Sequence, residues 1–134
     1  MRFMILVKAT KNSEAGVMPG EALLKEMGRY HEELAKAGVL VDANGLQASS
    51  KGFRVRYSGN GRTVEEGPFN DTWIAGYTVI NVKSRQEAID WATRYPNPYE
   101  TDGEIEVRQI FELEDFPQSE ATERFRELEG TSKS

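Results

Sequence analysis

The chain has 134 residues, of which 38% are hydrophobic and 29% charged, and its net charge is −5. This length fits one domain with a sizeable core, and the acidic balance excludes a global attraction to nucleic acid or to an anionic membrane. The lack of cysteine excludes disulfides, thiolate metal sites and a cysteine nucleophile. The single histidine, His31, excludes any mechanism that needs two imidazoles in one chain.

An apolar run at residues 3–7 predicts a strand over residues 2–8 that is covered on both faces. The run is too short for a membrane span or a secretory signal, so we expect a cytoplasmic protein. A helix should follow over residues 20–37, and Gly38 is placed to end it. Its apolar stripe recurs at helical spacing. The stripe consists of Leu23, Met27, Tyr30 and Leu34.

The middle of the chain predicts strands and a hairpin. "VLV" at 39–41 reads as a short strand that enters the turn-rich "DANG". "FRVRY" at 53–57 alternates apolar and basic residues, which is typical of a half-exposed strand. The turn signal at 58–61 lets "RTVEE" return as its hairpin partner.

The second half repeats the strand–helix–strand order. A strand is expected over 75–82, then a helix opened by a capping box at Ser84 and Glu87, then a strand over 104–112. The chain then predicts a polar terminal helix over 117–129 with a frayed end. We therefore divide it into a domain at 1–116 and a helical tail at 117–134.

Two strand–helix–strand halves on one antiparallel sheet predict an α+β, ferredoxin-like βαββαβ fold with an extra C-terminal helix. Both helices should lie on one face, which leaves the other face of the sheet uncovered. Because a bare apolar sheet face usually finds a partner, we expect a homodimer with the two sheets face to face.

Several segments together resemble the YCII-related family, in its DGPF-domain branch. They are "YHEELAKAGVLVDANGL", "SSKGFRVRYSGNGRTVEEGPF", "SRQEAIDWATRYPNP" and "GEIEVRQIFELEDF". The resemblance implies a dimeric α+β barrel in small bacterial proteins of mostly unknown function, some of them associated with extracytoplasmic-function sigma factors. It also implies suspected enzymatic activity, based on a characteristic His and Asp. This chain departs from the branch at Glu66, where an Asp is usual, and at residues 70–72.

The Gly67-Pro68-Phe69 segment lies between acidic residues and in front of an apolar strand. The architectural interpretation is that Gly and Pro end one strand and redirect the chain, while Phe69 plugs the end of the sheet. The functional interpretation is that the turn holds Glu66 and Asp71 at a pocket mouth, where paired carboxylates hold a metal or share a raised pKa.

His31 lies beside the apolar stripe of its helix, so it would act as an acid or base near neutral pH if a carboxylate orients it. Asp42 is one candidate for that carboxylate. The alternative is that His31 packs and hydrogen-bonds as a structural residue and that Asp42 forms a turn.

Four basic residues lie near the hairpin, and a fifth lies on the last strand. Arg54 shares a strand face with Arg56 and would bind an anionic ligand; the alternative is a charged edge that keeps the hairpin soluble. Arg108 is either a ligand anchor or a member of a structural ion pair. The remaining two are Lys51 and Arg62.

Two functions follow from these observations. The first is a non-catalytic module, regulatory or sigma-factor associated, that binds a small anionic ligand through Arg54, Arg108, Asp42 and Phe69. The alternative is a lyase- or isomerase-like enzyme for a small anionic or cyclic substrate, with His31, Glu66 and Asp71 as the catalytic residues. The sequence contains no phosphate-binding, dinucleotide-binding, hydrolase or zinc motif, so we expect neither a cofactor nor a metal.

Overall fold

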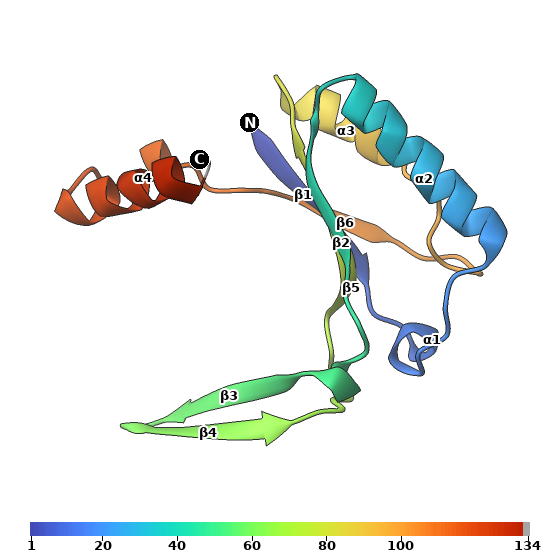
Figure 1. The fold of residues 1–134 in the computed structure, drawn as a ribbon, viewed down its shortest axis with the longest axis horizontal. Coiled ribbons are helices and arrows are strands. Elements are labelled where there is room, and N and C mark those ends of the chain that lie inside the picture. Colours follow the sequence, from blue (N-terminus) through green and yellow to red (C-terminus); the bar gives the residue numbers. More distant parts are fainter. Residues whose placement is uncertain (133–134) are drawn as a thin grey trace.

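The centre of the molecule is a four-stranded sheet with the strand order β2-β5-β1-β6 (Figure 1). In the computed structural model, which describes residues 1–132, every neighbouring pair in this sheet is antiparallel. The strands are β1 (Arg2–Lys8), β2 (Leu40–Gly45), β5 (Ile74–Asn81) and β6 (Ile105–Gln109). This order, with a helix after β1 and another after β5, is the predicted ferredoxin-like fold.

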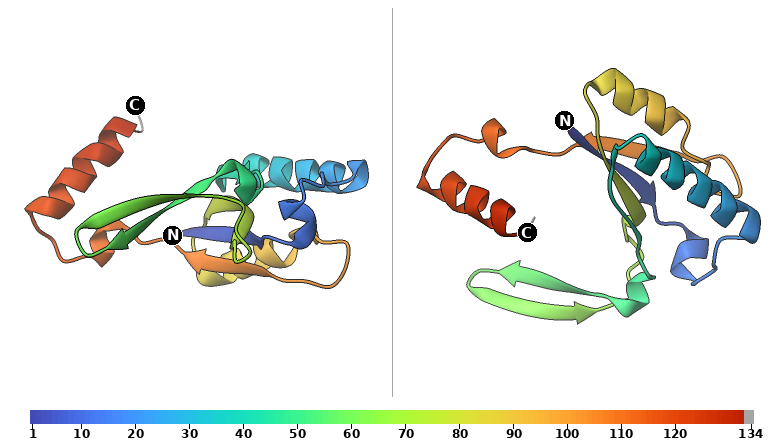
Figure 2. Two further views of the ribbon diagram at one scale, coloured as in Figure 1. Left: turned by 90° about the horizontal axis from the view of Figure 1, so that it is seen from below. Right: turned by 45° about the horizontal axis from the view of Figure 1, so that its top comes forward.

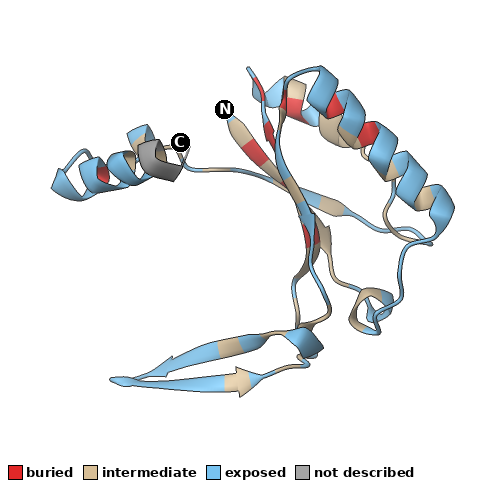
Figure 3. Cartoon of the chain, in the orientation of Figure 1, coloured by how far each residue is buried: buried red, intermediate tan, exposed pale blue. Residues whose placement is uncertain are grey.

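Two helices, α2 (Glu21–Lys36) and α3 (Arg85–Thr93), cover one side of the sheet (Figures 1 and 2). The buried core lies between them and the strands (Figure 3). Alternation along β1 explains this, because Phe3 and Ile5 point to the helices and are buried, whereas Met4 and Leu6 on the other side are only half-buried. We predicted cover on both faces of β1, and within one subunit the helices cover one face.

The ends of the core helices follow from local sequence. Gly38 has a φ of +74° after α2, and the amides of Gly38 and Val39 donate to the carbonyls of Ala35 and Leu34. This pair of bonds is a Schellman motif, which confirms the predicted helix stop. At the start of α3 the Ser84 side chain accepts from the backbone amide of Glu87 at 3.1 Å, as a capping residue does.

The hairpin forms a separate two-stranded sheet of β3 (Phe53–Ser58) and β4 (Gly61–Glu66). It projects from the sheet on the side away from α2 and α3, and so does the terminal helix α4 (Glu120–Ser132) (Figures 1 and 2). We call the sheet face on this side the open face. The apolar side chains of the hairpin, such as Phe53 and Tyr57, are exposed.

Three details differ from the sequence-based expectations. The "DANG" segment was predicted as a turn, but it belongs to β2, whose pairing with β5 contains an irregularity between Leu40 and Asp42. A short helix, α1 (Lys11–Glu14), was not predicted, although Thr10 and Ser13 form a capping box that starts it. Helix α4 continues to Ser132, and the rest of the predicted frayed end, residues 133–134, lies outside the described residues.

Within residues 1–132, no helix combines the length and the apolar character that crossing a membrane requires.

Candidate functional site

His31 lies on α2 and faces β5, where both of its ring nitrogens are occupied. Its Nδ1 lies 2.7 Å from the carbonyl oxygen of Met27, and its Nε2 lies 2.8 Å from the hydroxyl of Thr78. Because a carbonyl only accepts hydrogen bonds, Nδ1 carries the proton in the neutral ring and Nε2 accepts from Thr78. Neither nitrogen of the neutral imidazole is therefore left over to take a proton from a substrate.

Two tyrosines close the space around His31. The rings of Tyr30 and Tyr95 contact the imidazole edge-on, at centroid distances of 5.5 and 6.2 Å. The Tyr30 hydroxyl donates to the carbonyl of Trp91 at 2.7 Å, and burial raises the pKa of Tyr30 to about 12. Burial also raises the pKa of Tyr95, and a hydrogen bond with Thr78 opposes that shift. These groups form a packed, internally satisfied cluster.

Asp42 lies on the opposite face of the sheet from this cluster. In the β2–β5 register, Ala43 is opposite Thr78, whereas Asp42 is opposite Val79. Since successive residues of a strand point to opposite faces, Asp42 points to the open face and His31 does not share its side. The structure therefore does not bring His31 and Asp42 together.

On the open face, Asp42 forms a polar group with two neighbours. The Tyr77 hydroxyl donates to its carboxylate at 3.0 Å, and the Asn44 amide lies 3.0 Å from the Tyr77 hydroxyl and 3.3 Å from the carboxylate. Arg108 is on the same face, because it is opposite Met4 in the β1–β6 pairing. It is largely exposed and pairs with Glu106 at 3.3 Å.

The base of the hairpin brings three predicted residues together. The Arg54 guanidinium donates to the Asp71 carboxylate at 2.8 Å and lies over the Phe69 ring, 3.9 Å from its centroid. A second ring, that of Trp73, lies 5.3 Å from the same guanidinium and is 75% exposed. The hydrogen bond from Arg54 holds the pKa of Asp71 below its ordinary value. We call Arg54, Phe69, Asp71 and Trp73 the hairpin-base cluster.

Glu66 is not part of this cluster. It is opposite Phe53 in the β3–β4 pairing, whereas Arg54 is opposite Glu65, so Glu66 and Arg54 point to opposite faces of the hairpin. The three residues predicted as catalytic therefore lie in three different places. The His31 side chain is between α2 and β5, Asp71 is in the hairpin-base cluster, and Glu66 is on the hairpin face opposite to Arg54.

Sequence reasoning did not identify the partners of the Gly67-Pro68-Phe69 turn. The amide of Phe69 donates to the Ser49 hydroxyl at 2.9 Å, and the amide of Ser49 donates to the Glu14 carboxylate at 2.7 Å. The Ser49 hydroxyl also donates to Glu14. The Gly67 amide donates to the carbonyl of Gly52 at 3.0 Å. The turn thus joins α1, the segment before β3 and the hairpin, and no local signal in the sequence links these distant residues.

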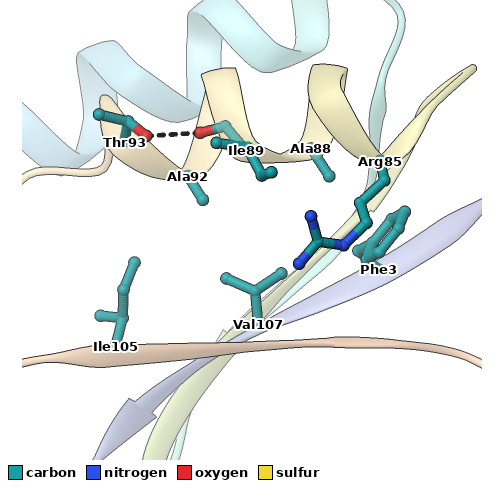
Figure 4. A pocket seen from close by; sticks show the side chains of 8 residues that line it. All are labelled: Phe3, Arg85, Ala88, Ile89, Ala92, Thr93, Ile105 and Val107. Carbon is teal, nitrogen blue, oxygen red and sulfur yellow. Dashed lines mark hydrogen bonds between the residues drawn. The ribbon is translucent and has the colours of Figure 1, made fainter.

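A pocket of about 270 Å³ lies between α3 and the strands β1 and β6 (Figure 4). Its wall is mostly apolar, with Phe3, Ile105 and Val107 on the sheet side, and Arg85 extends from the start of α3 toward Val107. The pocket is on the helix-covered side, and none of the predicted site residues lines it. In addition, no group of three or more acidic or histidine side chains within residues 1–132 is placed to hold a metal ion.

The fold and the open face define a small α+β protein of ferredoxin-like architecture. The model of the YCII-related domain family matches residues 1–114, and the chain therefore belongs to the YCII-related family. The DGPF branch stays a prediction from the sequence. A search of curated proteins finds no match for this chain.

Proposed function

We propose that the protein is a homodimeric, non-catalytic module that binds a small planar anion at the hairpin-base cluster. The observation that carries this proposal is the exposed ring of Trp73 beside the fixed guanidinium of Arg54. An indole that is mostly exposed offers a flat apolar surface, and the adjacent guanidinium attracts a carboxylate or a phosphate. An aromatic carboxylate would stack its ring on Trp73 and share the Arg54 guanidinium with Asp71, whose side chain accepts from one of its two terminal nitrogens.

The structure gives less support to an acid–base enzyme. Catalysis by His31 requires a free ring nitrogen and a nearby carboxylate, but both nitrogens have partners and Asp42 lies on the other face. The predicted carboxylates Glu66 and Asp71 are also in separate places. We therefore favour ligand binding over a lyase or isomerase reaction.

The homodimer rests on the apolar surface that one subunit leaves exposed. Valines and aromatic residues of the hairpin are exposed, as are Phe125 and Leu128 on α4, which lie one turn apart on one helix face. An isolated two-stranded hairpin is marginally stable in water, so a second subunit that covers it would account for its regular pairing. Sedimentation over a range of protein concentrations tests this: a single species of twice the 15.1 kDa chain mass is expected, and a monomer at every concentration refutes it.

Ligand binding is tested by tryptophan fluorescence and thermal stability with benzoate, inorganic phosphate and benzylamine as probes. We expect benzoate to quench the fluorescence and raise the melting temperature, and the cation benzylamine to do neither. The substitutions Trp73→Phe and Arg54→Gln should abolish the benzoate effect. His31→Gln is the matched control, since the proposal predicts unchanged binding. If binding is lost in His31→Gln and kept in Arg54→Gln, the site is wrongly placed.

The family resemblance also implies an association with a sigma factor, and we propose this as the regulatory context of the module. Co-purification with the chain as bait tests it, and the absence of any sigma factor in the eluate contradicts it.

A further inference from the structure

The pocket between α3 and the strands β1 and β6 has no role in the function proposed above. Two alanines of α3, Ala88 and Ala92, point toward the sheet there, and their side chains end at Cβ (Figure 4). Opposite them, Ile105 and Val107 lie on the same side of β6, because they are two residues apart on one strand. The small side chains on the helix leave a space of about 270 Å³ above the strand.

This space is long and narrow. Three further side chains of α3 line it at every fourth position, namely Arg85, Ile89 and Thr93. They are exposed, so the pocket opens to solvent along this side of the helix. From Arg85 to Thr93 a helix rises by about 12 Å, and the pocket volume lies just below the range of about 300–1,000 Å³ that is usual for small-molecule sites. A straight carbon chain fits such a space better than a system of fused rings.

Arg85 brings a positive charge that is not neutralised within the subunit. Its guanidinium extends from the first residue of α3 over the apolar wall toward Val107 (Figure 4). It makes no hydrogen bond or ion pair with any residue that the structure describes. The nearest acid along the helix, Glu87, accepts from the backbone amide of Lys83 at 2.9 Å. A cation in the first turn of a helix opposes the helix dipole, so an anion beside Arg85 would remove an unfavourable charge interaction.

The opposite end of the pocket offers no charge. The Thr93 hydroxyl there donates to the carbonyl of Ile89 at 2.6 Å, so its proton is already used. The sheet side of the pocket is formed by Phe3, Ile105 and Val107, which present only apolar atoms from their side chains. A ligand that matches this wall therefore has a negative group at one end and an unbranched apolar tail.

We propose that the pocket binds an aliphatic monocarboxylate, with its carboxylate on Arg85 and its hydrocarbon chain between α3 and β6. A guanidinium binds a carboxylate through two parallel hydrogen bonds, and burial of the chain supplies the remaining affinity. The site lies on the helix-covered side of the sheet. It shares no residue with the hairpin-base cluster and selects a flexible chain instead of a planar ring.

Methyl NMR spectroscopy locates the ligand, because Ile89, Ile105 and Val107 carry methyl groups on the pocket wall. We expect hexanoate to shift these methyl signals, and hexylamine, which has the opposite charge, to leave them unchanged. Butanoate has the same carboxylate and a shorter chain. Since each buried methylene group strengthens binding by roughly fourfold, butanoate should bind at least about tenfold more weakly than hexanoate.

Two substitutions remove the two parts of the site. Arg85→Gln removes the charge and should weaken hexanoate binding by about tenfold or more. Ala92→Leu fills the space under α3 and should abolish binding. Arg29→Gln is the matched control, because Arg29 is an exposed arginine on α2 that does not line the pocket, and it should bind hexanoate as the wild type does. Circular dichroism checks that each variant is folded, and Arg85→Gln decides the question if Ala92→Leu does not fold.

Three results would each overturn the proposal. Hexanoate leaves the methyl signals of Ile89, Ile105 and Val107 unchanged, or hexylamine shifts them equally, or Arg85→Gln binds hexanoate as tightly as the wild type. Equal affinities for butanoate and hexanoate also contradict it, since the chain is then not buried. The hairpin-base cluster is tested separately with benzoate, so either site is able to fail without the other.

Discussion

The substitution Gly67→Ala tests the role of the Gly-Pro-Phe turn most directly. A Cβ on residue 67 would lie 1.9 Å from the carbonyl oxygen of Ser49 and 2.7 Å from its carbonyl carbon. The two segments must separate by about 1.5 Å to reach an ordinary contact of 3.4 Å. Overpacking of this kind costs about 1–3 kcal/mol, and weakening the bond from the Gly67 amide to Gly52 adds about 1 kcal/mol. We expect a total loss of about 2–4 kcal/mol.

Urea denaturation at one fixed protein concentration measures this loss, because the stability of the proposed homodimer would depend on concentration. Hydrogen exchange of the hairpin amides shows whether the damage is local. Gly52→Ala is the matched control from the segment that contacts the turn. Its Cβ would lie at an ordinary 3.7 Å from the same Ser49 oxygen, so it should change stability by less than about 1 kcal/mol. If Gly67→Ala matches the control in both measurements, the close approach of the two backbones does not matter to stability.

Four further substitutions test the core, the exposed positions of α2 and the buried tyrosine. Leu34→Ala removes a fully buried side chain and should cost about 2–5 kcal/mol, whereas Leu24→Ala on the exposed side of α2 should cost less than about 1 kcal/mol; equal losses would contradict the burial. The Cβ of Gly28→Ala would lie in open space, so this substitution should raise the free energy of unfolding by about 0.5–1 kcal/mol. A lower free energy of unfolding would contradict the open space at this position. The raised pKa of Tyr30, about 12 against an ordinary 10, favours the neutral hydroxyl in the folded state. The contribution of Tyr30 to the free energy of unfolding should then be fully present below pH 10 and decrease between pH 10 and 12. In urea denaturation at several pH values, Tyr30→Phe should show a smaller decrease over this range than the wild type.

The sequence was sufficient for the fold because its signals are local and agree with one another. Gly38 ends α2 and Ser84 starts α3 as predicted, whereas the unbroken apolar run of β1 predicted the strand but not which of its faces meets the helices. The turn predicted at "DANG" failed because local turn propensity was overridden by pairing with β5. Backbone hydrogen bonds to a central strand outweigh the preference of Asp and Asn for turns.

The candidate site was harder to predict because its residues meet only through tertiary structure. The contact of Arg54 with Phe69 and Asp71 depends on how the turn folds back on the hairpin. Trp73 lies just before the strand predicted over 75–82, and its high exposure has no local signal. The separation of His31 from Asp42 depends on the strand register, in which a shift of one residue changes the face.

The hairpin and α4 are attached at the margins of the sheet, and α4 lies beyond the part of the chain that the family shares. Their exposed side chains make no contribution to the packing between the sheet and its two core helices. The core therefore does not constrain the residues of these two appendages, so related chains are able to change the surfaces that we propose for recognition while they keep the same interior.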